Sequence, residues 1–114
     1  MENILNTIKK MLGIDSSYTP FDVDILVGIN SAFFVLNQLG VGPSEVFIAD
    51  ANSTWSDFAD LDCIEAIKNY VYLKTRLTFD PPVNSFVVDS ISAQILEYEW
   101  RLNTSCDIRE EVDS

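Results

Sequence analysis

The chain has no histidine, only two cysteines and only seven lysines and arginines among its 114 residues. Without histidine there is no imidazole base for a conventional catalytic triad. Cys63 and Cys106 lie far apart and outside any CxxC spacing, so we expect two free thiols and no zinc site. The four glycines form no phosphate-binding loop. These absences predict a protein with no enzyme activity, no catalytic residues, no bound metal and no cofactor.

The chain also lacks a long hydrophobic run. Its most apolar stretch, residues 25–39, is interrupted by Asn30, Asn37 and Gln38. A membrane span needs roughly 18–20 apolar residues in succession, so we expect no membrane association. The basic pair at residues 9–10 follows apolar residues instead of preceding a long hydrophobic segment, which is not the pattern of a signal peptide. The sequence therefore predicts a cytosolic location where the protein is made.

Positive charge is scarce, with 18 acids against seven bases and a formal net charge of −11. Binding to nucleic acid through phosphate neutralisation needs clustered lysine and arginine, which this chain does not have. The simplest interpretation of the acidic excess is solubility. Two more specific interpretations are a surface that repels DNA, as in a conduit, and a surface that imitates DNA.

Apolar residues recur with helical spacing in four segments, which are residues 2–12, 20–39, 56–79 and 81–102. Thr19 and Asp80 are placed to cap the second and fourth segments, with Pro20 and Pro81 at the first helical positions. The Asp80-Pro81-Pro82 break predicts that the last two segments form a helical hairpin. The sequence thus predicts an all-α fold, a small bundle of about four helices with a long loop-rich middle segment.

The second helical segment is apolar on more than one side. One stripe contains Ile25 and Ile29, and a second contains Leu26, Val27, Phe34 and Val35. Such a helix is either central to the fold or also meets a neighbouring subunit. Tyr72 and Trp100 fall off the main stripes of the later helices, and this surplus of apolar surface favours self-association.

Two regions outside the helices are candidates for binding. Residues 41–56 have no clear periodicity, and this stretch is either an ordinary connection or a binding loop. Residues 104–114 form an acidic tail, which we expect to be disordered when free and separate from a helical domain at 1–103. The candidate interaction residues of the whole chain are Phe34, Val35, Phe47, Trp55, Tyr72, Trp100, Ile108 and Val112.

Three stretches carry a resemblance to a known family: YVYLKTRL at 70–77, FDPP at 79–82 and EYEWRLN at 97–103. These stretches resemble the small head–tail connector proteins of tailed bacteriophages. The order of elements is also similar, with a short helix, a long helix, a loop-rich middle and a closing helical pair. The residues concerned are packing and hinge residues rather than a catalytic signature.

The resemblance implies a structural virion protein that forms a homo-oligomeric ring, commonly a dodecamer, beneath the portal protein. Such a ring extends the DNA channel, lets DNA pass without specific binding, and offers a docking platform to the next tail-side or stopper protein. The implied location is the head–tail interface of the virion, and the host cytoplasm before assembly. The alternative is a small acidic helical inhibitor, of the DNA-mimic or immunity type, that binds a basic site on another protein.

Overall fold

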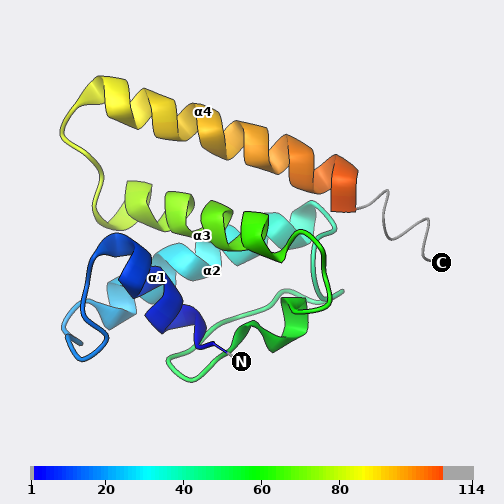
Figure 1. The fold of residues 1–114 in the computed structure, drawn as a ribbon, viewed down its shortest axis with the longest axis horizontal. Helices are drawn as coiled ribbons and strands as arrows, with labels where there is room; N and C mark the ends of the chain where they lie inside the picture. Colours follow the sequence, from blue (N-terminus) through cyan, green and yellow to red (C-terminus); the bar gives the residue numbers. More distant parts are fainter. Residues whose placement is uncertain (1, 107–114) are drawn as a thin grey trace.

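The computed structural model describes residues 2–106, the last two by their backbone only, and the predicted all-α fold is confirmed (Figure 1). Within these residues, β structure is limited to one isolated bridge between Asn3 and Thr54. The elements are α1 (Ile4–Leu12), α2 (Asp22–Gln38), the 3-10 turn η1 (Trp55–Phe58), α3 (Ile64–Phe79), α4 (Ser85–Arg101) and the π-helical turn η2 (Leu102–Cys106).

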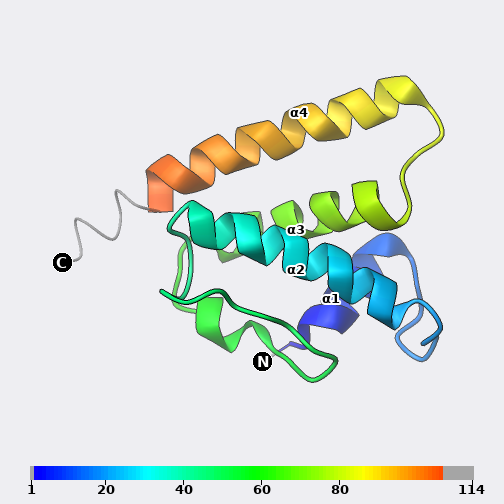
Figure 2. The same ribbon diagram turned by 180° about the vertical axis from the view of Figure 1, so that it is seen from behind.

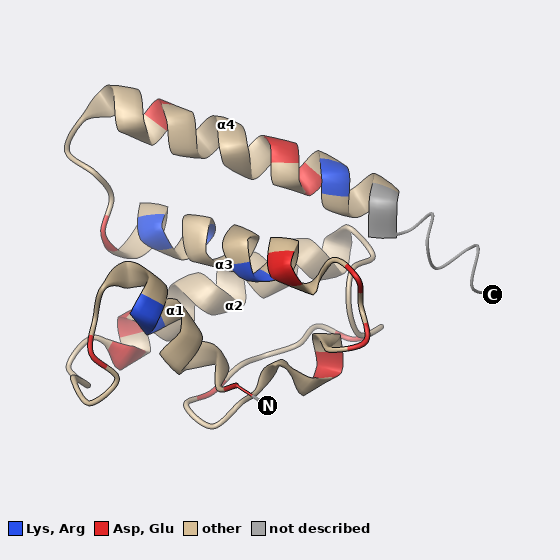
Figure 3. Cartoon of the chain, viewed as in Figure 1, with Lys and Arg blue, Asp and Glu red and all other residues tan. Residues whose placement is uncertain are grey.

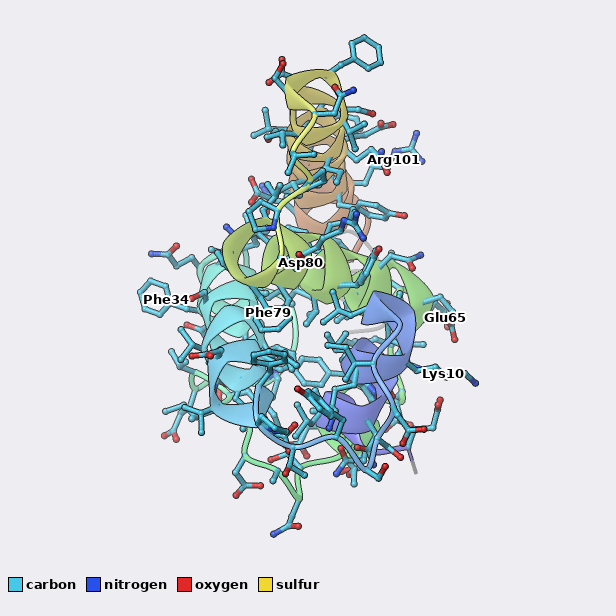
Figure 4. All side chains as sticks on the ribbon, turned by 90° about the vertical axis from the view of Figure 1, so that its left-hand side faces the viewer. Lys10, Phe34, Glu65, Phe79, Asp80 and Arg101 are labelled. Atoms are coloured by element: carbon cyan, nitrogen blue, oxygen red, sulfur yellow. The ribbon has the colours of Figure 1, made fainter. Side chains whose placement is uncertain are left out.

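The helices lie in three levels. The helix α3 occupies the middle, with α1 and α2 on one side of it and α4 on the other (Figures 1 and 2). The end-on view shows the same order, with α4 beyond α3 and the pair α1 and α2 below it (Figure 4). The α3–α4 pair is the helical hairpin that the sequence predicts. The helix α4 therefore contacts the rest of the bundle along one side only.

Close contact between α2 and α3 depends on Gly28. A Cβ atom at this position would lie 2.9 Å from the Thr78 Oγ1 atom and 3.1 Å from the Thr75 Cα atom. At the end of the same interface, the rings of Phe21 and Phe79 meet edge to face at 5.3 Å. The two helices are thus antiparallel and packed closely along most of their length.

An aromatic cluster joins α2 to the loop that follows it. The Phe33 ring stacks on Phe58 at 5.2 Å and meets the edges of Phe47 and Trp55. The indole N–H of Trp55 donates a hydrogen bond of 3.1 Å to the Thr7 hydroxyl on α1. The loop is therefore anchored in the hydrophobic core at several points, although it contains no regular helix before η1.

A buried lysine closes the connection between α1 and α2. The Lys9 ammonium donates hydrogen bonds to the carbonyl oxygens of Ser16 and Tyr18 and to the Asp22 carboxylate, at 3.1, 2.6 and 2.8 Å. Three oxygen partners satisfy the three N–H groups of an ammonium, so its burial leaves no unpaired donor.

Both predicted proline-based helix starts are wrong. The helix α2 begins at Asp22, because Thr19 and Pro20 form a turn in which the Thr19 carbonyl accepts from the Asp22 N–H at 3.1 Å. The helix α4 begins at Ser85, because the Asn84 side chain accepts from the N–H of Phe86 at 2.8 Å and so takes the cap position. The asparagine side chain accepts hydrogen bonds from free N–H groups of the first helical turn, whereas a proline side chain has no acceptor for them.

The expected start of the third helix is also wrong by several residues. Trp55 and Phe58 form a separate 3-10 turn, and α3 begins only at Ile64. A 3-10 turn places side chains three residues apart on one side, which lets both aromatic rings enter the core together. Cys63, just before α3, is disulfide-bonded, so the expectation of a free thiol there is wrong.

Candidate interaction surfaces

Of the six candidate interaction residues that the structure describes, two are well exposed, and they lie on different helices. Phe34 on α2 is 52% exposed and Trp100 on α4 is 68% exposed. Val35 is partly buried beside Phe34, and Tyr72 on α3 is partly buried, with its hydroxyl accepting from Arg76 at 3.4 Å. Phe34 and Trp100 are therefore the candidates most open to a partner.

The two loop candidates point inward. Trp55 is fully buried, and Phe47 is partly buried against Phe33 and Phe58. In this chain both serve the aromatic cluster. The apolar side chains that the loop does present to solvent are Val46 and Ile48, with Ile48 75% exposed. Ile108 and Val112 lie outside the described residues.

The first surface is an apolar groove along the outer side of α2, which we call the α2 groove. Its apolar lining residues are Val23, Leu26, Val27, Phe34 and Val35. Lys74 of α3 also lines it, and this is the only charged residue among the lining residues. Phe34 marks this side in Figure 4, where it lies on the opposite side of the molecule from Lys10 and Glu65. The α2 groove is thus apolar, with one cation.

The second surface is the side of α4 that faces away from α3, which we call the α4 outer stripe. At 3.6 residues per turn, the positions 86, 89, 93, 96 and 100 share one side of the helix. The residues there are Phe86, Asp89, Ala93, Leu96 and Trp100, all exposed, and Val83 before the helix is exposed as well. The opposite side of α4 carries Ile91 and Ile95, which are buried against α3. The helix is thus apolar on two opposite sides, of which one is covered.

Sequence reasoning found part of each surface. The second apolar stripe of α2 already contained four residues of the α2 groove and omitted only Val23. On α4, the sequence pattern indicated the inner stripe and Trp100, but Phe86 and Leu96 were not grouped with Trp100. The three- and four-residue steps through positions 86, 89, 93, 96 and 100 that join them were present in the sequence as the signal of a second side.

The charges of the described residues form no metal-binding group. Among residues 2–106, no group of three or more acidic or cysteine side chains is close enough to hold a metal ion. Figure 3 shows lysine and arginine spread over α1, α3 and α4, with acids around the loop and near helix ends. Hydrogen bonds within turns lower the pKa of two acids: the Ser17 hydroxyl acts on Asp15, and the Asn52 N–H acts on Asp50. These are effects of local turn structure.

One titratable side chain links two helices. The Tyr70 hydroxyl on α3 donates a hydrogen bond of 2.7 Å to the Glu99 carboxylate on α4. Burial raises the pKa of Tyr70 well above its ordinary value, and the neighbouring Glu99 carboxylate raises it further. The hydrogen bond links α4 to α3. Within the part of the chain that the structure describes, no helix has both the length and the apolar character to cross a membrane.

Comparison with known proteins gives one result. A family model described as "Phage connector protein" matches residues 4–109, which is most of the chain. Among curated proteins and among solved structures, no significant match was found.

Proposed function

Because the chain belongs to the phage connector protein family, we propose that it forms a homo-oligomeric ring, dodecameric in the simplest case, beneath the portal of a tailed bacteriophage. In this role it would extend the DNA channel and provide the docking platform for a tail-side or stopper protein. Its place would be the head–tail interface of the virion, after a soluble stage in the host cytoplasm.

The observation that carries this proposal is that the chain has two uncovered apolar surfaces, the α2 groove and the α4 outer stripe. Phe86, Leu96 and Trp100 are each more than 60% exposed, as are Val23 and Val27 on α2. Extended apolar patches on a soluble chain mark sites of protein–protein contact. Two different patches on one chain suit a head-to-tail contact, which generates a ring when it closes.

The charge of the chain supports a conduit for DNA. With a net charge of −11 and the few basic residues that the structure describes spread over three helices, the chain has little of the clustered positive charge that phosphate binding needs (Figure 3). A channel wall of like charge repels packaged DNA and lets it pass without sticking. Acids that follow one face at phosphate-like spacing would instead favour DNA mimicry, and the acids here gather in the loop and near helix ends.

The portal and the tail-side protein are the proposed partners at the two rims of the ring. The loop between α2 and α3 is a candidate contact, because Val46 and Ile48 are exposed on it while its inner side is anchored by Phe47 and Asn30. The Asn30 side chain donates to the Ala49 carbonyl and accepts from the Ala49 N–H, at 3.1 and 2.7 Å. A loop held in this way presents its outer side chains with little loss of freedom on binding.

Light-scattering mass of the purified protein, alone and mixed with the portal protein encoded beside it, tests the proposal. We expect either a ring-sized mass or capture on the portal. A monomer that does not bind the portal but binds a basic host protein would overturn the proposal and favour the alternative function, an acidic inhibitor. A monomer that binds neither would also overturn it.

A further inference from the structure

We propose that the α4 outer stripe of one subunit packs into the α2 groove of the next, with Asp89 of the stripe paired to Lys74 of the groove. This inference rests on the proposed ring and specifies the contact that would build it. Both surfaces belong to the same chain, so every copy offers one of each to its neighbours.

The two surfaces fit in length and form. From position 23 to position 35 the α2 groove runs about 18 Å, and from 86 to 100 the α4 outer stripe runs about 21 Å, at 1.5 Å per residue. The groove is hollowed along a helix, whereas the stripe is a row of large side chains ending in Trp100. When two helices pack, a row of side chains on one helix lies in the groove between rows of side chains on the other. Lengthwise docking of α4 along α2 therefore covers much of both surfaces.

Each surface contains a single charge, and the two charges are opposite. Lys74 is the one charged residue lining the α2 groove, and Asp89 is the one charged residue within the α4 outer stripe. Glu97 and Arg101 lie beside the stripe and are already paired with each other at 2.7 Å. Between residues 2 and 106, neither Lys74 nor Asp89 has an ion-pair partner.

The position of Lys74 suits this pairing. Because α3 is antiparallel to α2, with Thr75 opposite Gly28, Lys74 lies beside the middle of the α2 groove rather than at an end. Lys74 also lines the adjoining α3–α4 groove, where Glu99 is the one acid among the lining residues. The Glu99 carboxylate accepts the Tyr70 hydroxyl, and among the described residues it forms no ion pair with Lys74, so the Lys74 ammonium is available to a neighbouring subunit.

The same charges disfavour the two self-pairings. If the α4 outer stripe packed against its own copy, each Asp89 carboxylate would be buried without a cation. If the α2 groove met its own copy, two Lys74 ammonium groups would be buried together. An unpaired buried charge is strongly unfavourable, so the arrangement favours the contact between unlike surfaces.

The test is a charge exchange, read by light-scattering mass with the portal protein present. Lys74→Glu and Asp89→Lys each place like charges across the contact, and we expect assembly to weaken about tenfold or more. In a mixture of the two single variants, opposite charges meet at every contact between unlike variants. We therefore expect mixed assemblies in which the two variants alternate. The double variant carries the exchanged pair and should assemble alone. Circular dichroism checks that each variant is folded.

Two control variants carry the same charge changes elsewhere. Lys10→Glu changes an exposed lysine on the side opposite the α2 groove (Figure 4), and Asp60→Lys changes an exposed acid before α3. Both should assemble as the unaltered chain does. Normal assembly of the Lys74→Glu and Asp89→Lys variants would contradict the proposed contact but not the proposed ring. An unaltered chain that stays monomeric with the portal would overturn the ring, and the contact with it.

Discussion

The helices α2 and α4 have equal length but are held in the fold very differently. The helix α2 buries Ile25, Gly28, Ile29, Ala32, Phe33 and Leu36 among α1, α3 and the loop. The helix α4 buries only Ile91 and Ile95, on its one side toward α3. Burial of apolar area is the main stabilising term, so α2 is part of the stable core and α4 is attached to it. Much of the apolar surface of α4 is left exposed.

The largest expected effect is at the centre of the aromatic cluster. Phe33→Ala removes a ring that contacts Phe47, Trp55 and Phe58, and should lower the free energy of unfolding by about 3–5 kcal/mol. Urea denaturation measures this change. The matched control is Phe34→Ala, where the adjacent ring is 52% exposed and the cost should be below about 1 kcal/mol. Equal costs would contradict the division between a buried and an exposed side of α2.

The next effect is at the α2–α3 contact. Gly28→Ala places a methyl group against Thr75 and Thr78, which overpacks the interface. Helix propensity offsets part of the strain, so we expect a net loss of about 1–2 kcal/mol in the free energy of unfolding. Ser31→Ala, at an exposed position of the same helix, should be neutral or slightly stabilising. A stabilised Gly28→Ala protein would show that α2 and α3 are less closely packed than described.

A smaller and local effect is expected at the α3–α4 link. Tyr70→Phe removes the hydroxyl that donates to Glu99, which should cost about 1 kcal/mol and speed amide hydrogen exchange in α4 more than in α2. Tyr72→Phe is the control, because its hydroxyl makes only a long contact of 3.4 Å with Arg76. Uniformly faster exchange in both helices would argue against a separately opening α4.

The same link gives a pH dependence with a definite sign. The pKa of Tyr70 is raised in the folded chain, so above the ordinary value of 10.0 the unfolded tyrosine loses its proton while the folded one keeps it. The stabilisation is therefore complete below that pH and declines as the pH rises beyond it. Urea titrations between neutral and alkaline pH should show this decline, and Tyr70→Phe should reduce it.

The smallest effect on stability is expected on the outer side of α4. Leu96→Ser changes a residue that is 67% exposed, and should alter the free energy of unfolding by less than about 0.5 kcal/mol. Ile95→Ser, one residue earlier but on the buried side, should cost several times more. If only the Leu96 variant loses assembly while keeping full stability, the two sides of α4 have separate roles.

The sequence was sufficient to predict the helices, because their apolar periodicity follows from which side each one buries. It predicted the end of α3 at Phe79 and the hairpin after it. Helix starts were less predictable. Pro20 and Pro81 suggested the first helical positions, but a turn precedes α2 at Pro20, and Asn84 caps α4 after Pro81. Caps depend on which side chain reaches a free N–H, and this depends on the path of the preceding turn.

The candidate surfaces were predicted in part. Phe34 and Trp100 proved to be exposed because they fall off the buried stripes of regular helices, where local spacing determines direction. Trp55 and Phe47 lie in or beside an irregular loop, whose path depends on contacts with α1 and α2 that are distant in sequence. Periodicity carries no information on such contacts, and so it could not show that these rings point inward.

The separation of the α2 groove from the α4 outer stripe has a genetic consequence. A subunit damaged only on its α4 outer stripe would keep an intact α2 groove, and would still accept the neighbour that docks there. It would then end the growing assembly at its own damaged side. Such an allele, expressed beside the normal gene, would be dominant, and phage yield would fall by more than the fraction of altered subunits.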